Sequence, residues 1–195
     1  MKIISSGYIE KYTAIILFGN GYRDRRIIGK IASKYNHFKT LLDPSLPHLT
    51  GSAVLRQLIE LIEETPASIY IIVIDREHFE ELMNKLPTYA FRVPEQENLA
   101  DGLIKITCER GPRKITLYIA TLGLTEKGCI EENLAQLIEL VKGEKVKPEK
   151  HIINTWLAKN KIKDYELIDS ASINQLKRAF PAITQLLEIL KQDPA

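Results

Sequence analysis

Residues 69–74, Ile-Tyr-Ile-Ile-Val-Ile, constrain the fold of this chain most, because six apolar or aromatic residues run without a break into Asp75. An unbroken run of this length, rich in β-branched residues, is typical of a strand buried on both faces of a parallel sheet. Ligands of open α/β sheets bind outside the carboxyl ends of their strands. We therefore expect Asp75, and Glu77 two residues later, to lie at the functional edge of a central sheet.

Segments before and after this strand alternate between strand and helix patterns. Apolar runs predict strands at 13–18 and 37–42, and helical spacing of apolar residues predicts helices at 24–35, 51–64 and from 76 to about 86. The first strand ends in Gly19-Asn20-Gly21, residue types that suit positive φ and a tight turn. Such alternation predicts a parallel sheet with right-handed crossovers.

The second half of the chain has a different pattern. Strands are predicted at 102–108 and 114–122, with a hairpin connection at 111–112, and helices at 130–141, 149–160 and 172–192, the last broken at Pro181. The expected fold class is α/β, with a mostly parallel central sheet flanked by helices and a helical C-terminal tail. Trp156 is expected to anchor that tail in the core rather than to stack on a base.

Composition excludes several classes of protein. A formal net charge of +2 is too small for electrostatic wrapping of nucleic acid, although local basic patches can still act. The two cysteines do not form a disulfide framework, and Cys108 lies in a predicted strand as a core thiol. No signal peptide or membrane-length apolar run is found, so we expect a cytoplasmic protein without membrane contact. Many Ile, Lys and Glu with only two methionines hint at a thermophilic source.

Acidic residues fall where predicted strands meet helices, and they are the candidate metal ligands. They are Asp24, Asp75, Glu77 and Glu131. Carboxylates from several strand ends can converge on Mg²⁺, which takes oxygen ligands. The alternative is that Asp75 caps a helix while the glutamates lie in solvated first turns, where acids are common.

Basic residues cluster at the start of the first predicted helix. Arg23, Arg25, Arg26 and Lys30 either contact a phosphate backbone or form a solvated helix face. Other catalytic patterns are missing: no Gly-Lys-Ser/Thr follows the glycine-rich turn, the four histidines have no zinc spacing, and no Gly-x-Ser-x-Gly occurs.

Three motifs follow one another along the chain: Asn20-Gly21-Tyr22-Arg23-Asp24, Asp75-Arg76-Glu77 and Gly128-Cys129-Ile130-Glu131. The tail then contains Trp156-Leu157-Ala158. This order and spacing resembles the Toprim domain of topoisomerases, primases and the overcoming-lysogenization-defect nucleases, and especially a family of Toprim-related prokaryotic proteins of similar length. The resemblance implies a Toprim/Rossmann-like α/β domain at 1–143 and a helical extension at 144–195 packed on it as a single globular unit.

For function, the resemblance implies metal-dependent processing of nucleic-acid phosphodiesters. Asp75, Glu77 and Glu131 would hold Mg²⁺ or Mn²⁺, and Asn20, Asp24 and Asp75 would occupy the catalytic positions. Two departures bear on activity: Asn20 stands where the family has glutamate, and Glu77 stands where the family has aspartate. An amide cannot take a proton at neutral pH and is a poorer ligand for a hard cation.

Three functions are therefore open. The chain is a Toprim-like metal-dependent enzyme, a degenerate Toprim-like binding module, or a Rossmann-like nucleotide sensor that binds an anion at Gly19-Asn20-Gly21 and the adjacent helix N-terminus. Nucleic acid is the expected partner, and homo-oligomerisation is left open.

Overall fold

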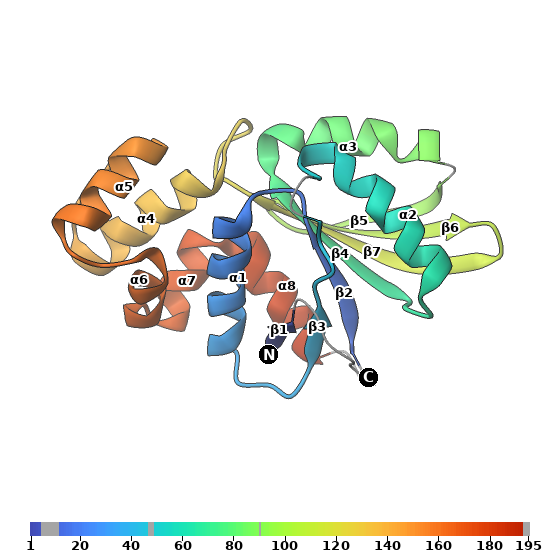
Figure 1. Ribbon diagram of the computed structural model, residues 1–195, viewed down its shortest axis with the longest axis horizontal. Coiled ribbons are helices and arrows are strands. Elements are labelled where there is room, and N and C mark those ends of the chain that lie inside the picture. Colours follow the sequence, from blue (N-terminus) through green and yellow to red (C-terminus); the bar gives the residue numbers. More distant parts are fainter. Residues whose placement is uncertain (5–11, 47–48, 90, 193–195) are drawn as a thin grey trace.

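A single mixed sheet forms the centre of the protein in the computed structural model, which describes residues 1–4, 12–46, 49–89 and 91–192 (Figure 1). Its strands, in spatial order, are β1 (Lys2–Ile4), β3 (Thr40–Leu42), β2 (Ala14–Phe18), β4 (Ile69–Asp75), β7 (Arg113–Leu122), β6 (Leu103–Arg110) and β5 (Arg92–Ala100). β4 lies in the middle of this order, as its unbroken apolar sequence predicts, and five of its seven residues are buried.

The sheet is mixed rather than mostly parallel. Strands β1, β3, β2, β4 and β7 pair in parallel, whereas β6 and β5 add two antiparallel pairs on one side. The antiparallel pairing follows from the length of the connection, since β6 and β7 are joined by two residues and a parallel crossover needs a dozen or more. The α/β class is thus as predicted, and the mostly parallel sheet is corrected to a mixed one.

Helices cover both faces of the sheet (Figure 1). Their bounds are α1 Tyr22–Lys34, α2 Val54–Glu64, α3 Phe79–Lys85, α4 Ile130–Lys142, α5 Lys150–Lys159, α6 Asp164–Ser170, α7 Ile173–Ala179 and α8 Pro181–Gln192, with short 3₁₀ turns at Gly51–Ala53, Arg76–His78 and Pro87–Tyr89. Alternate residues of β2 and β4 point to opposite faces. One set packs against α2 and α3, and the other packs against α1, α4 and α8.

The C-terminal helices share a core with the sheet. Residues of α7 and α8 belong to the same buried cluster as Ile71 of β4 and Tyr118 of β7, and Trp156 of α5 is buried in it too. Trp156 also donates its indole Nε1–H to Glu144 at 2.8 Å. The expectation that Trp156 anchors the tail in the core is therefore confirmed. None of the helices in the described ranges is long and apolar enough to serve as a membrane span.

Candidate carboxylate site at the ends of β2 and β4

Asp75 is the last residue of β4 and lies half-buried at the carboxyl edge of the sheet. Its Oδ1 accepts a hydrogen bond from the backbone N–H of Ile130 at 3.3 Å, and Ile130 is the first residue of α4. The first N–H groups of a helix lack partners within the helix and attract negative charge. Asp75 therefore caps a helix, as the simpler interpretation proposed, but the helix is α4 and not the one that follows it in sequence.

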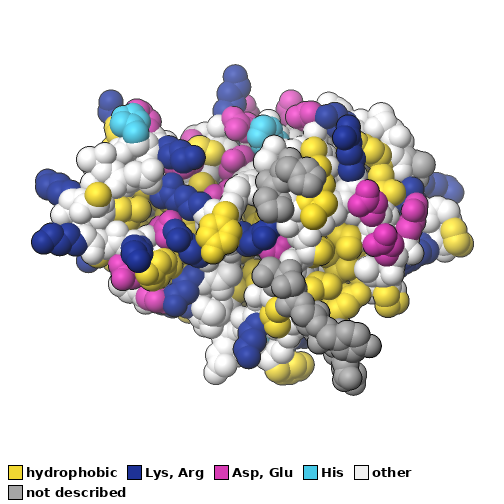
Figure 2. Space-filling view, in the orientation of Figure 1, with side chains coloured by type: hydrophobic (Ala, Val, Ile, Leu, Met, Phe, Trp, Pro, Cys, Tyr) yellow, Lys and Arg dark blue, Asp and Glu magenta, His cyan; other side chains and the backbone are white. Residues whose placement is uncertain are grey.

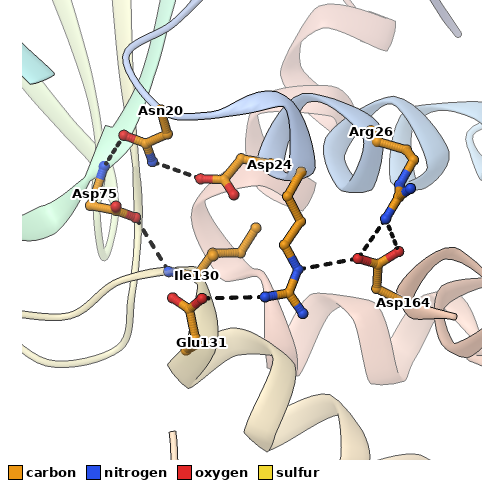
Figure 3. Close-up of polar contacts among 8 residues, drawn as sticks. Asn20, Asp24, Arg26, Asp75, Ile130, Glu131 and Asp164 are labelled. Atoms are coloured by element: carbon orange, nitrogen blue, oxygen red, sulfur yellow. Dashed lines mark hydrogen bonds and ion pairs between the residues drawn. The ribbon is translucent and has the colours of Figure 1, made fainter. Parts of the chain in front are cut away.

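Asn20 joins Asp75 to Asp24 across two strand ends (Figure 3). Its Oδ1 accepts from the backbone N–H of Asp75 at 3.3 Å, and its Nδ2 donates to Asp24 Oδ2 at 2.9 Å. Asp24 lies in the first turn of α1 and is buried. Because β2 and β4 are parallel neighbours, their carboxyl ends bring these three side chains together, which the sequence predicted.

The turn itself differs from its prediction. Gly21 has φ −72° and serves as the N-cap of α1, and neither Gly21 nor Gly19 is among the residues with positive φ. Gly19 is needed for a different reason, since a Cβ there would lie 2.4 Å from Ile74 Cγ2 and 3.0 Å from Gly51 O. Close packing of β2 against its neighbours, rather than a left-handed turn, excludes a side chain at Gly19.

The two aspartates have raised pKa values. Burial raises the pKa of Asp75 to about 7, and the charge of Asp24 is the next largest cause, with smaller contributions from Glu131 and Glu77. Burial also raises the pKa of Asp24 to about 6, opposed mainly by the hydrogen bond from Asn20. No ion pair reaches either carboxylate from the part of the chain that the structure describes. The site thus holds two acids in a setting that disfavours their charges.

Glu131, in the first turn of α4, pairs with Arg23 and does not join the two aspartates as a third ligand. Arg23 Nη1 lies 3.3 Å from Glu131 Oε1, and Arg23 Nε lies 3.2 Å from Asp164 Oδ2. Asp164 also accepts from Arg26 Nη2 at 2.7 and 2.9 Å (Figure 3). These contacts form a charged network between α1, α4 and α6 beside the aspartate pair.

The structure does not gather the three expected metal ligands into one group. Glu77 is exposed, and its Oε1 lies 3.7 Å from His78 Nε2. Among the described residues, no set of three or more His, Cys, Asp or Glu side chains is placed to hold a metal ion. Asp24 and Asp75 therefore remain as a pair, within electrostatic reach of Glu77 and Glu131.

A cavity of about 690 Å³ is lined by Arg76 and Glu77, which follow Asp75 in the chain, whereas Asp24 and Asp75 do not line it. Its other walls come from the start of α3, the β5–β6 connection and residues 126–127. Arg76 reaches into it and is held by Asp101 at 2.8 Å and by Thr121 Oγ1 at 3.4 Å. The volume falls in the usual range for small-molecule pockets.

The basic cluster of α1 has a role that neither interpretation of the sequence foresaw. Arg23 and Arg26 bind Asp164, Arg25 Nε lies 2.9 Å from Asp43 Oδ2, and Lys30 Nζ lies 2.8 Å from Asp169 Oδ2. These four cations neither form a free phosphate surface nor a merely solvated face, because each is paired with an acid. Sequence reasoning missed Asp164, which is about 140 positions away from its partners. The one available signal was a local excess of cations, since residues 23–30 contain four cations and only one acid, Asp24.

The comparisons with known proteins give no further assignment. No family model, no curated protein and no solved structure matches the chain.

A nucleotide sensor that binds an anion at the N-terminus of α1 has no support in the geometry, because the buried Asp24 lies in that first turn and would repel an anion.

Proposed function

We propose that this protein is a Toprim-like, divalent-cation-dependent protein that acts on phosphodiesters of nucleic acid. The observation that carries the proposal is the meeting of Asp24 and Asp75 at the carboxyl edge of the sheet, without a cationic partner in the described residues. Ligands of such sheets bind at this edge.

The residues present fit Mg²⁺ or Mn²⁺. Both cations take oxygen ligands, and Mg²⁺ is often held by one or two carboxylates, with water and substrate phosphates completing its shell. The raised pKa values of Asp24 and Asp75 mean that a nearby dication would relieve an unfavourable arrangement of charge. Asp24 and Asp75 would hold the ion, and Glu131 would lie behind them, neutralised by Arg23.

Arg23 supports a phosphorylated substrate. Its Nε and Nη1 bind Asp164 and Glu131, but its Nη2 is buried without a hydrogen-bond acceptor in the described residues. A buried guanidinium N–H without a partner is costly, and guanidinium groups match phosphate oxygens in geometry. A phosphoryl oxygen bound beside the aspartate pair would give Arg23 Nη2 the acceptor that it lacks.

The chain's own residues would orient the reaction. Asn20 fixes Asp24 and the backbone of Asp75 in one arrangement through its two hydrogen bonds. As ligands of the ion, Asp24 and Asp75 would place it, and the water that it carries, beside the phosphoryl group. A bound dication would supply Lewis-acid polarisation of the phosphoryl oxygen.

The test combines cation binding with cleavage. Purified protein is titrated with Mn²⁺ by calorimetry and then incubated with labelled DNA and RNA oligonucleotides in Mg²⁺ or Mn²⁺. We expect Mn²⁺ binding and cleavage by the wild type, and loss of both in Asp75→Asn, which keeps the acceptor for Ile130. Glu60→Gln, an exposed change on α2, is the matched control and should behave as wild type. Equal cleavage by the wild type and Asp75→Asn would overturn the proposal.

One observation favours a second candidate, a Toprim-like binding module without catalysis. Asn20 replaces the carboxylate that the resemblance leads us to expect, and Glu131 already forms an ion pair with Arg23. This candidate predicts that the protein binds its partner without cleaving it and takes up Mn²⁺ weakly. Tight Mn²⁺ uptake that depends on Asp75 would exclude it.

A further inference from the structure

Exposed lysines gather on the connection between α4 and α5 and on the ends of α5. We call the following residues the lysine surface: Lys142, Lys145, Lys147, Lys150, Lys159 and Lys161. All six are exposed, and between residues 142 and 161 the only acids are Glu144 and Glu149. The whole chain has a formal net charge of only +2, so positive charge is concentrated on this part of the molecule.

The acids near the lysine surface do not neutralise it. Glu144 accepts from the indole of Trp156, and Glu149 lies 3.6 Å from His151. Within the described residues, only Lys145 of the six forms an ion pair, with Glu139 at 3.7 Å, and the Lys145 side chain is 85% exposed in that pair. This differs from the basic cluster of α1, in which every cation has an acidic partner.

One residue of the lysine surface is close enough to the carboxylate site for its charge to act there. Lys150 begins α5, and its charge is among those that act on Asp24. Figure 2 shows Lys and Arg side chains gathered over the part of this face where α1, α5 and α6 lie. A polyanion that follows the lysines would therefore be brought to Asp24 and Asp75, whereas an anionic membrane has no reason to meet that site.

An exposed aromatic side chain begins the helix that carries Asp24. Tyr22, two residues before Asp24, is 75% exposed, and its ring is one of the few large hydrophobic groups left open to solvent in the described residues. Single-stranded nucleic acids bind proteins through a basic track and aromatic rings on which bases stack. A base pair within a duplex does not offer its face to such a ring.

Lys161 gives an independent sign that this surface is used. It follows the C-cap of α5 with φ +53°, the only non-glycine residue with positive φ in the described ranges. Glycine is favoured at this position after a helix, and a lysine there is strained. Strain of this kind is found at functional sites, where the side chain is worth its conformational cost.

We propose that the lysine surface and Tyr22 bind single-stranded nucleic acid, with the lysines on the phosphates and Tyr22 under a base. The path of the bound nucleic acid toward Asp24 and Asp75 rests on the proposed function. Binding itself needs no cation at these aspartates. Binding and cleavage can therefore fail separately.

The test measures fluorescence anisotropy of a labelled 20-nucleotide dT strand in EDTA at 50 and 200 mM KCl. We expect salt-dependent binding by the wild type and at least tenfold weaker binding by the triple variant Lys147→Glu, Lys150→Glu, Lys159→Glu. The control triple, Lys2→Glu, Lys114→Glu, Lys191→Glu, has the same charge change on exposed lysines outside the lysine surface. It should stay within threefold of wild type. Binding in EDTA that depends on the lysine surface would stand even if the wild type cleaves nothing in Mg²⁺ or Mn²⁺.

Two single variants separate binding from folding. Lys161→Gly should keep or raise the melting temperature, because it relieves the positive φ, and should still weaken binding two- to fivefold. Tyr22→Ala should weaken binding of the single strand more than that of a matched duplex. The proposal is overturned if the wild type does not bind at 50 mM KCl, if both triples lose affinity equally, if duplex is preferred, or if Lys161→Gly binds as wild type. It is equally overturned if anionic vesicles bind through these lysines while the oligonucleotide does not.

Discussion

Arg26 Nη2 lies 2.7 Å from Asp164 Oδ1 and 2.9 Å from Asp164 Oδ2, so a single guanidinium nitrogen joins the second turn of α1 to the start of α6. Asp164 is 4% exposed, and Arg23 binds it as well. One buried carboxylate thus fixes α6 against α1. It also holds Arg23 beside Glu131.

Replacing Asp164 with Asn should destabilise the protein by about 2–3 kcal/mol, because the change leaves two arginines without their counter-charge. The loss is smaller than for a fully buried pair, since the Arg26 side chain is 41% exposed. Urea unfolding at pH 7 measures it. The matched control is Asp169→Asn, whose partner Lys30 is on the surface, and it should cost less than about 1 kcal/mol. Equal losses in the two variants would contradict the role given to Asp164.

The stability of the cation-free protein should fall as pH rises from about 4 to 7. Folding raises the pKa of Asp75 from its ordinary value of 3.8 to about 7, so the folded state binds more protons than the unfolded state across this window. A group with a raised pKa stabilises the fold fully below its unfolded pKa and loses that stabilisation as pH passes its folded pKa. Asp24 acts in the same direction, up to about pH 6.

Asp75→Asn should remove part of this pH dependence. We compare the free energy of unfolding of the variant with that of wild type, in EDTA. Between pH 4 and pH 8, this difference should shift in favour of the variant by roughly 1–3 kcal/mol. Urea unfolding from pH 4 to 8.5 checks it, with Glu60→Gln as the control. Parallel pH profiles for the wild type and Asp75→Asn would show that folding does not raise the pKa of Asp75.

Asn20→Asp should strengthen cation binding and weaken the cation-free fold. The change replaces a donor to Asp24 with a third carboxylate between Asp24 and Asp75, which raises repulsion at neutral pH. We expect at least tenfold tighter Mn²⁺ binding by calorimetry and a lower melting temperature in EDTA at pH 8. Asn20→Ala, which removes both hydrogen bonds without adding charge, separates the two effects. A melting temperature that Mn²⁺ does not restore in Asn20→Asp would count against cation binding at this place.

Gly123→Ala should destabilise the protein by about 3 kcal/mol or more. Gly123 has φ +102°, and a Cβ there would lie 2.3 Å from the backbone carbon of Gly128, so both strain and a backbone clash oppose a side chain. Gly111→Ala is the control, because Gly111 has φ +57° but open space around it. Its cost should be about 1 kcal/mol, the strain alone. Chemical unfolding of both variants gives the comparison.

Long apolar segments were readable from the sequence because burial on both faces leaves a clear pattern. β2, β4 and β7, and helices α1, α2, α4, α5 and α8, occur close to their predicted limits. β5 was missed because its exposed stretch Glu95–Asn98 has no apolar alternation, which suits a charged edge strand. β1 and α6 were missed because three and seven residues are too short to carry a period.

The candidate site was predictable where it depends on strand order and not where it depends on distant side chains. Asn20, Asp24 and Asp75 meet because parallel neighbours end at one edge. Nothing local indicates that Glu131 is taken by Arg23, since that contact depends on how α4 and α6 pack on α1. The helix that Asp75 caps could not be foreseen for the same reason, as Ile130 is 55 positions away.

The shared core of α8 and the sheet has a consequence for how the protein is made. Residues 181–192 cover a face of β7, so that face stays bare until nearly the last described residue has left the ribosome. The nascent chain must therefore keep an apolar sheet surface from aggregating until α8 has emerged. We expect the final folding step to wait for α8, and chaperone binding to be strongest on ribosome-bound chains that lack α8.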